Sequence, residues 1–117
     1  MKRILLVDDD KRILRLLMEE LEEEGYLIST ASNGKEALSL LKNGGQRPDL
    51  VILDLRMPEM NGLETMGFIL KLKFKLPVII FSAYSGYRND ALAMAADAYV
   101  VKSSDLSELK KRVHELG

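Results

Sequence analysis

Residues 50–62 decide the fold, and they read LVILDLRMPEMNG. The first four are apolar, a run typical of a parallel strand that is buried on both faces. Asp54 ends this run, and open α/β sheets bind their ligands outside the carboxyl ends of the strands. Met57-Pro58 and Asn61-Gly62 then predict a structured loop, because proline fixes φ and Asn-Gly readily takes positive φ, and a helix should start near Gly62. Taken alone, Asp54 is best explained as a residue that caps the following turn.

The composition indicates one domain that covers residues 1–117. A chain of 117 residues can bury a core of ordinary size. Lys and Arg number 17 against 18 Asp and Glu, so no basic field favours nucleic acid. The absence of cysteine excludes disulfides, thiolate metal sites and cysteine nucleophiles. Because no apolar run approaches the roughly 20 residues of a membrane helix and no signal peptide precedes the first strand, we expect a soluble, cytoplasmic protein that contacts no membrane.

Buried strands alternate with amphipathic helices along the chain. The predicted strands are residues 4–7, 26–31, 50–53, 78–81 and 98–101. The residues expected on the inner faces of the helices are Ile13, Leu16, Leu17 and Leu21; Ala37, Leu38 and Leu41; Leu63, Met66, Ile69 and Leu70; and Leu106, Leu109, Val113 and Leu116. Residues 91–95 leave room for only a short helix. This order predicts an α/β protein, a single doubly wound five-stranded parallel sheet with five helices.

The ends of these helices carry their own signals. Gly25 follows the first helix as a C-terminal cap should. Asn33 with Glu36, and Asp105 with Glu108, have the spacing of an N-cap pair.

Polar residues follow four of the five predicted strands. They are Asp8-Asp9, Asp54, Ser82 and Lys102. Because parallel strands point the same way, these residues should gather at one rim of the sheet. Carboxylates so close together repel and raise one another's pKa unless a cation offsets them, and Mg²⁺ is a hard cation that prefers oxygen ligands.

Each of these residues also has a purely structural explanation. The run from Asp8 to Asp10 could cap a helix, Ser82 could belong to a turn, and Lys102 could end an edge strand. Singly, these explanations are at least as good as a functional one. The joint pattern at the ends of strands one, three, four and five is much harder to obtain by chance.

The sequence resembles the receiver domain of two-component response regulators over essentially its whole length. The matching stretches are VDD at 7–9, LDLRMPEMNG at 53–62, SA at 82–83 and YVVK at 99–102. The resemblance implies a flavodoxin-like receiver fold with strand order 2-1-3-4-5. It also implies a signalling switch, activated by phosphorylation, that is not a turnover enzyme on an external substrate.

Site residues follow from the same resemblance. Asp54 is the expected phosphoacceptor, with a sensor histidine kinase or a histidine phosphotransfer protein as donor. Mg²⁺ is the expected cofactor, held by Asp8 through water, by Asp9, by Asp54 and by the backbone carbonyl of Arg56. Lys102 and Ser82 would bind the phosphoryl oxygens. Ser82 and Tyr99 would move on phosphorylation and so control a downstream protein or an output domain, with no direct binding of nucleic acid.

Three features depart from the family pattern. Ser103 follows the lysine where proline is usual, so the normally cis bond should be trans here, because a cis bond before a residue other than proline costs about 2.5–4 kcal/mol. Ala95 stands where a glycine is usual. The segment between Ser82 and Lys102 is short, which leaves the pocket intact but puts the usual output surface in doubt.

His114 is expected on the surface of the last helix.

Other protein classes fit less well. A haloacid-dehalogenase-type phosphatase needs a second Asp two residues after the first, where Arg56 stands. A nucleotide-binding module needs a glycine-rich turn after the first strand, where Asp8-Asp9-Asp10 would repel phosphates. A degenerate receiver that only binds proteins usually lacks one of the acidic groups present here. The sequence names neither the kinase nor the signal, and leaves open whether the chain works alone or was cut from a longer protein.

Overall fold

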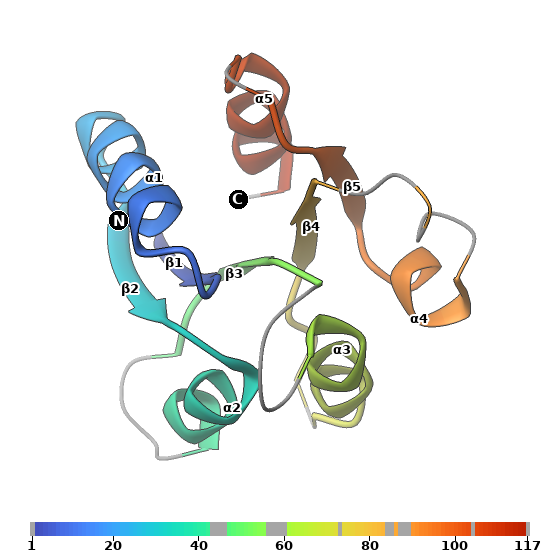
Figure 1. Cartoon of the computed structure of the whole chain (residues 1–117). Coiled ribbons are helices and arrows are strands. Elements are labelled where there is room, and N and C mark those ends of the chain that lie inside the picture. The colour runs from blue at the N-terminus through green and yellow to red at the C-terminus, as the bar shows by residue number, and fades with distance from the viewer. Residues whose placement is uncertain are drawn as a thin grey trace.

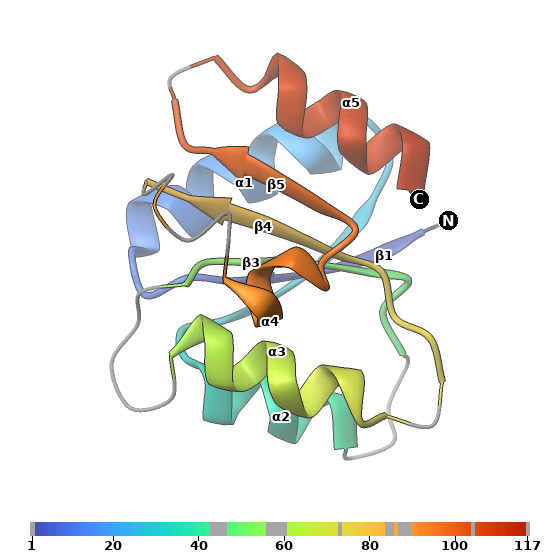
Figure 2. The ribbon, with the colours of Figure 1, turned by 90° about the vertical axis from the view of Figure 1, so that its right-hand side faces the viewer.

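Five parallel strands form one sheet between two layers of helices (Figures 1 and 2). This computed structural model describes residues 2–42, 47–55, 61–72, 74–83, 86, 90–103 and 105–116. The strands are β1 (Arg3–Val7), β2 (Leu27–Ala31), β3 (Leu50–Leu53), β4 (Val78–Ser82) and β5 (Ala98–Val101). The helices are α1 (Lys11–Glu23), α2 (Gly34–Lys42), α3 (Gly62–Leu70), α4 (Ala91–Met94) and α5 (Ser107–Leu116). The strand order β2-β1-β3-β4-β5 confirms the predicted fold.

The apolar runs of the sequence become the centre of the sheet. Every residue of β3 and β4 is buried, as expected for strands that are covered on both faces. Figure 2 shows α1 and α5 on one face of the sheet and α2, α3 and α4 on the other. Alternate residues of each strand therefore point into one of two separate core clusters: Leu5 and Val51 belong to one, and Ile4 and Ile52 to the other.

Helix α1 begins and ends as its sequence predicts. The Asp10 side chain caps the helix by accepting a 2.9 Å hydrogen bond from the backbone N–H of Arg12. Gly25, with φ of 96°, follows the C-cap in the left-handed conformation that glycine adopts without strain.

Two leucines predicted to face the core are exposed instead. Leu16 of α1 is 45% exposed, because the buried stripe of this helix runs through Leu14, Leu17 and Leu21. At 3.6 residues per turn, Leu16 points nearly opposite to Leu14. Leu70, the last residue of α3, is 51% exposed, whereas the buried residues of this helix are Gly62, Thr65, Met66 and Ile69.

The expectation of positive φ at Asn61-Gly62 is wrong. Asn61 has a φ of −71° and caps α3, and Gly62 is the first residue of that helix. The Asn61 side chain accepts from the N–H of Glu64 at 2.9 Å, and the Glu64 carboxylate accepts from the N–H of Asn61 at 3.4 Å. This capping box needs an extended residue before the helix, and it begins α3 at Gly62, where the start of a helix was predicted. Met57-Pro58 lies outside the described residues.

Candidate functional site

Three carboxylates meet at the C-terminal ends of β1 and β3. Asp8 and Asp9 directly follow β1, and Asp54 directly follows β3. The backbone N–H of Asp54 donates to the carbonyl of Val7 at 2.9 Å, which holds the ends of the two strands side by side. Oxygen atoms of the three carboxylates lie within 4.8 Å of one another. They form the one cluster of possible metal ligands found in the part of the chain that the structure describes.

Lys102 reaches this cluster from the end of β5. Its Nζ lies 2.7 Å from Oδ2 of Asp8 and 3.5 Å from Oδ1 of Asp54. Its backbone N–H donates to the carbonyl of Ser82 at 2.7 Å, which fixes where the side chain begins. Lys102 thus forms ion pairs with two of the three carboxylates.

The charge balance of the site favours a further cation. Burial, followed by the negative charge of Asp8, raises the pKa of Asp54 to about 6, although Lys102 acts in the opposite direction. Burial also raises the pKa of Asp8, against the hydrogen bond from Lys102. Burial alone would lower the pKa of Lys102, but the hydrogen bond to Asp8 and the nearby carboxylates outweigh it and raise that pKa. One ammonium therefore faces three carboxylates, and this excess of negative charge makes the site suitable for a divalent ion.

The other predicted site residues lie on β4 and β5 or outside the described part. Ser82 is fully buried at the end of β4 and pairs with Val101. Tyr99 pairs with Ile80 and packs, half-buried, against the core cluster beneath α2 and α3. Arg56, the expected source of a carbonyl ligand, lies outside the described residues.

Two predictions about the last helix and its approach are confirmed. His114 is exposed on α5. The Lys102–Ser103 peptide bond is trans, since the described residues contain no cis bond. The Ser103 hydroxyl donates to the carbonyl of Asp105 at 2.9 Å and accepts from its N–H at 3.2 Å. The N–H of Ser107, the first residue of α5, donates to the carboxylate of Asp105 at 2.9 Å. Together these three hydrogen bonds stabilise the turn before α5.

Two neighbours of the site were not predicted. A Cβ added to Gly62 would lie 2.2 Å from the carbonyl oxygen of Asp54, so only glycine lets α3 begin against this backbone. The Asn61-Gly62 pair was the available signal, but its residue types do not show how closely the two backbones approach each other. The ring of Phe81 has its centre 6.0 Å from Nζ of Lys102. Its position directly before Ser82 was the only hint in the sequence.

Within the described ranges, no helix is long and apolar enough to cross a bilayer.

Comparisons with known proteins identify the family. A model described as the response regulator receiver domain matches residues 4–114. Response regulator SaeR of Staphylococcus aureus (strain USA300) is 36% identical over 118 residues, which cover 99% of this chain and 50% of SaeR. The chain thus spans about half the length of the curated relatives it matches.

Solved structures of response regulators agree with that match. TrrA of Thermotoga maritima, crystallised with Mg²⁺-BeF, superposes with a TM-score of 0.94 at 53% identity over 100% of both chains. TrrA in complex with the histidine kinase ThkA superposes with a TM-score of 0.90 at 53% identity, over 99% of this chain and 98% of that one. The chain therefore belongs to the response regulator receiver domains, the phosphorylation-activated switches of two-component signalling.

Proposed function

We propose that Asp54 of this receiver domain, which we take to span residues 1–117, accepts a phosphoryl group from a phosphohistidine of a partner protein. The observation that carries the proposal is the position of the Asp54 carboxylate, buried within a cluster of acidic groups and 3.5 Å from the ammonium of Lys102. A carboxylate in this position can act as a nucleophile, because the positive charge of Lys102 offsets part of the negative charge around it.

In this transfer, an O–P bond to Asp54 replaces the P–N bond of phosphohistidine. An oxygen of Asp54 forms a bond to phosphorus while the P–N bond of phosphohistidine breaks, and the leaving imidazole keeps the electron pair and takes up a proton. Phosphoryl transfer depends mainly on positioning and charge stabilisation. Lys102 supplies a fixed positive charge beside Asp54, and the Ser82 hydroxyl supplies a donor at the neighbouring strand end. The domain thus assists its own modification and has no turnover on an external substrate.

Mg²⁺ fits the donor set of this site. Asp9, Asp54 and the carbonyl of Arg56 would hold the ion, with Asp8 acting through water. The spacing of the three carboxylates within 4.8 Å and the raised pKa of Asp54 support this assignment. The crystal structure of TrrA with Mg²⁺-BeF supports it further. When bound, Mg²⁺ supplies positive charge that offsets the carboxylates and the phosphoryl oxygens.

The response to phosphorylation involves β4 and β5. A phosphoryl group on Asp54 would attract the Ser82 hydroxyl, and Tyr99 would turn inward into the space that this movement leaves. Such a change biases a two-state element and so alters the surface that a downstream protein or output domain contacts. If so, Ser82→Ala should still be phosphorylated but should show smaller amide shifts in NMR spectra along β5. Equal shifts in the variant and the wild type would contradict this role.

The phosphoryl donor is a sensor histidine kinase or a histidine phosphotransfer protein, and the reaction takes place in the cytoplasm. The complex of TrrA with the kinase ThkA supports a kinase as partner. Neither nucleic acid nor a membrane is required for these steps.

Treatment with acetyl phosphate tests the proposal. Intact-mass spectrometry should detect one added phosphoryl group when Mg²⁺ is present and none after chelation with EDTA. Asp54→Asn should stay unmodified under both conditions. Equal modification with and without Mg²⁺, or modification of Asp54→Asn, would overturn the assignment.

A further inference from the structure

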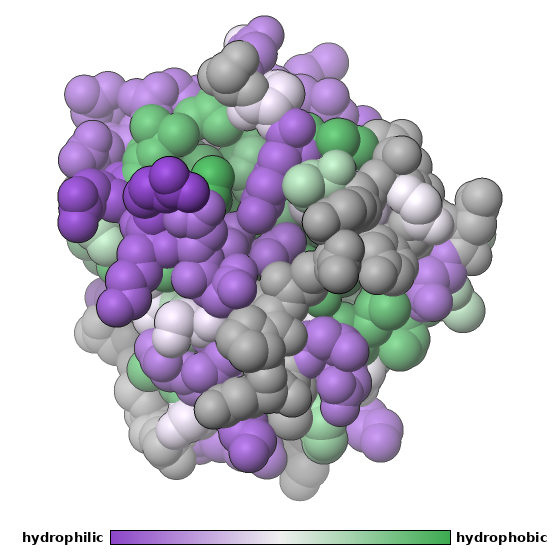
Figure 3. All heavy atoms as spheres, viewed as in Figure 1, coloured by the Kyte–Doolittle hydropathy of each residue, from purple (hydrophilic) through white to green (hydrophobic). Residues whose placement is uncertain are grey.

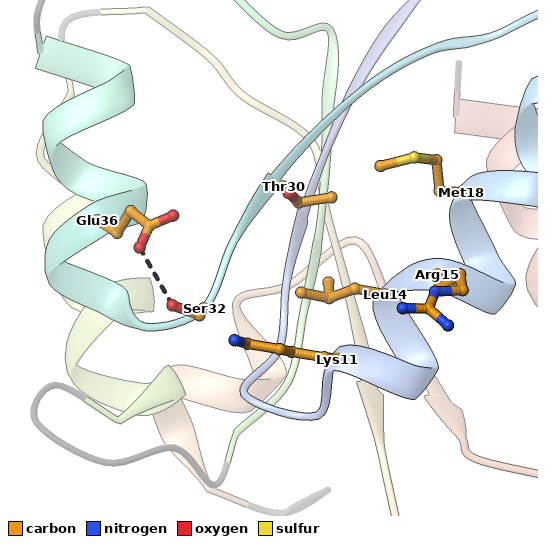
Figure 4. A pocket seen from close by; sticks show the side chains of 7 residues that line it. All are labelled: Lys11, Leu14, Arg15, Met18, Thr30, Ser32 and Glu36. Atoms are coloured by element: carbon orange, nitrogen blue, oxygen red, sulfur yellow. Dashed lines mark hydrogen bonds between the residues drawn. The ribbon is translucent and has the colours of Figure 1, made fainter.

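A groove of about 380 Å³ lies between α1, β2 and the start of α2. Figure 4 shows the residues that line it. Lys11 and Arg15 extend from α1, Thr30 lies on β2 with Ser32 directly after that strand, and Glu36 comes from α2. Leu14 and Met18 of α1 complete the lining. None of the residues proposed for phosphoryl transfer lines this groove, so its function is a separate question.

Two cations of the groove have no ion pair among the described residues, whereas some other cations of this protein do. Arg12 pairs with Asp10, and Lys110 of α5 pairs with Glu20 and Glu24 of α1. Lys11 and Arg15 are exposed, and neither makes an ion pair with any residue that the structure describes. Glu36, across the groove, accepts a 3.1 Å hydrogen bond from the Ser32 hydroxyl, the contact drawn in Figure 4. The side of the groove formed by α1 is therefore positively charged and available to an anion.

The lining between these charges is apolar. Leu14 is 8% exposed and Met18 is half-buried against the core cluster beneath α1. A methionine side chain adapts its shape to a neighbour, and an apolar side chain laid on it would be removed from water. A ligand that matches the groove thus combines an apolar group with a negative charge.

The edge of the sheet favours a polypeptide. β2 is the outermost strand on this side, and the strand order places no further strand beyond it among the described residues. Such an edge can align an extended chain.

We propose that this groove binds an acidic segment of a partner protein. An apolar side chain of that segment lies on Leu14 and Met18, and a carboxylate next to it binds Lys11 and Arg15. The charge complementarity of the α1 side and the open edge at β2 carry the inference.

Defined peptides test this inference. The probe is a synthetic ten-residue peptide with one leucine between two glutamates in a glycine-serine background. Titration into ¹⁵N-labelled protein should shift the amides of residues 14–18 and 30–32 with a Kd at or below about 1 mM. Matched peptides with glutamine for glutamate, or serine for leucine, should bind at least about tenfold more weakly.

Two variants separate the groove from general charge effects. Arg15→Glu should weaken binding of the acidic peptide at least about tenfold, because it reverses a charge that the ligand contacts. Lys111→Glu makes a similar change of net charge at an exposed site on α5 and should bind like the wild type. Both variants should keep the wild-type Mg²⁺ response.

Several results would overturn the inference. They are the absence of shifts, shifts outside the groove, equal binding of the glutamine peptide, and equal loss in Lys111→Glu. Equal binding of acetate alone would reduce the groove to an anion site. Shifts of the same amides that depend on protein concentration would make a second copy of the chain the occupant.

Discussion

The surroundings of Asp54 disfavour the charged form of its carboxylate in the metal-free protein. Its pKa is raised to about 6, first by burial and then by the charge of Asp8. An acidic group in an unfolded chain titrates near 3.9, so between about pH 4 and 6 the folded protein binds more protons than the unfolded one. Ionisation of Asp54 in the metal-free protein therefore costs stability.

This charge cost gives a pH dependence with a defined sign. In EDTA, the contribution of Asp54 to the free energy of unfolding should fall by at most about 3 kcal/mol as the pH rises from about 4 to 7. Asp54→Asn should reduce this slope in urea denaturation, while Asp8, whose pKa is also raised, preserves part of it. An equal slope in the wild type and in Asp54→Asn would contradict the raised pKa.

Gly62 is the residue whose size matters most to the backbone at Asp54. The Cβ of Gly62→Ala would lie 2.2 Å from the Asp54 carbonyl oxygen and 2.5 Å from Cα of Leu55, so the start of α3 must shift. We expect a loss of about 1–3 kcal/mol in urea denaturation and slower labelling by acetyl phosphate. Gly67→Ala is the matched control on the same helix, since an added Cβ there meets nothing within 4 Å. It should gain about 0.5–1 kcal/mol; equal effects at both glycines would contradict the role of Gly62.

Helix α1 contributes to three surfaces at once. Its buried stripe packs on the sheet, Lys11 and Arg15 line the groove beside β2, and Leu16 is exposed to solvent. Figure 3 shows hydrophilic side chains over much of α1 and an apolar patch where α1 and α5 approach each other, with another apolar area near α3 and α4. Because α1 begins next to the acidic cluster, we expect a protein that phosphorylates Asp54 to approach the first turns of this helix.

Leu16 is therefore expected to contact the kinase. With a phosphorylated histidine kinase that labels the wild type as donor, Leu16→Glu should receive the phosphoryl group at least about tenfold more slowly. Its labelling by acetyl phosphate should be unchanged, because the small donor needs no docking surface. Leu70→Glu is the control, since Leu70 has a similar exposure on α3, across the sheet. A loss with both donors, or an equal loss in the two variants, would argue against a docking role.

The elements were predictable because their signals are local. Continuous apolar runs such as residues 50–53 and 78–81 identified the buried strands, and the acidic, hydroxyl and lysine residues at their ends identified the rim. Leu16 and Leu70 were misplaced because periodicity alone cannot tell which flank of a helix faces the sheet. The close approach of Gly62 to Asp54 depends on tertiary geometry, which no sequence spacing encodes.

The whole molecule should be stabilised by the ion that its site is suited to hold. At a Mg²⁺ concentration about 100 times the Kd, binding adds about 2.7 kcal/mol to the free energy of unfolding. The melting temperature should then rise by roughly 8–15 °C in calorimetry. Asp9→Ala should lose most of this rise, because it removes one carboxylate of the cluster.

Asp10→Ala is the matched control for the Mg²⁺ response. It removes a carboxylate from the adjacent position but touches only the N-cap of α1, so it should cost about 1 kcal/mol and keep the response to Mg²⁺. A full response in Asp9→Ala, or its loss in Asp10→Ala, would place the ion elsewhere.

The most direct test of the account is the identity of the residue that carries the phosphoryl group. The protein is treated with acetyl phosphate and Mg²⁺, reduced with borohydride to convert an aspartyl phosphate to homoserine, digested and mapped by mass spectrometry. We predict homoserine at position 54 alone, at a yield that falls on alkaline treatment before reduction. Homoserine at Asp8 or Asp9, or a stable phosphoryl group on a serine, would contradict the assignment of Asp54 as the phosphoacceptor.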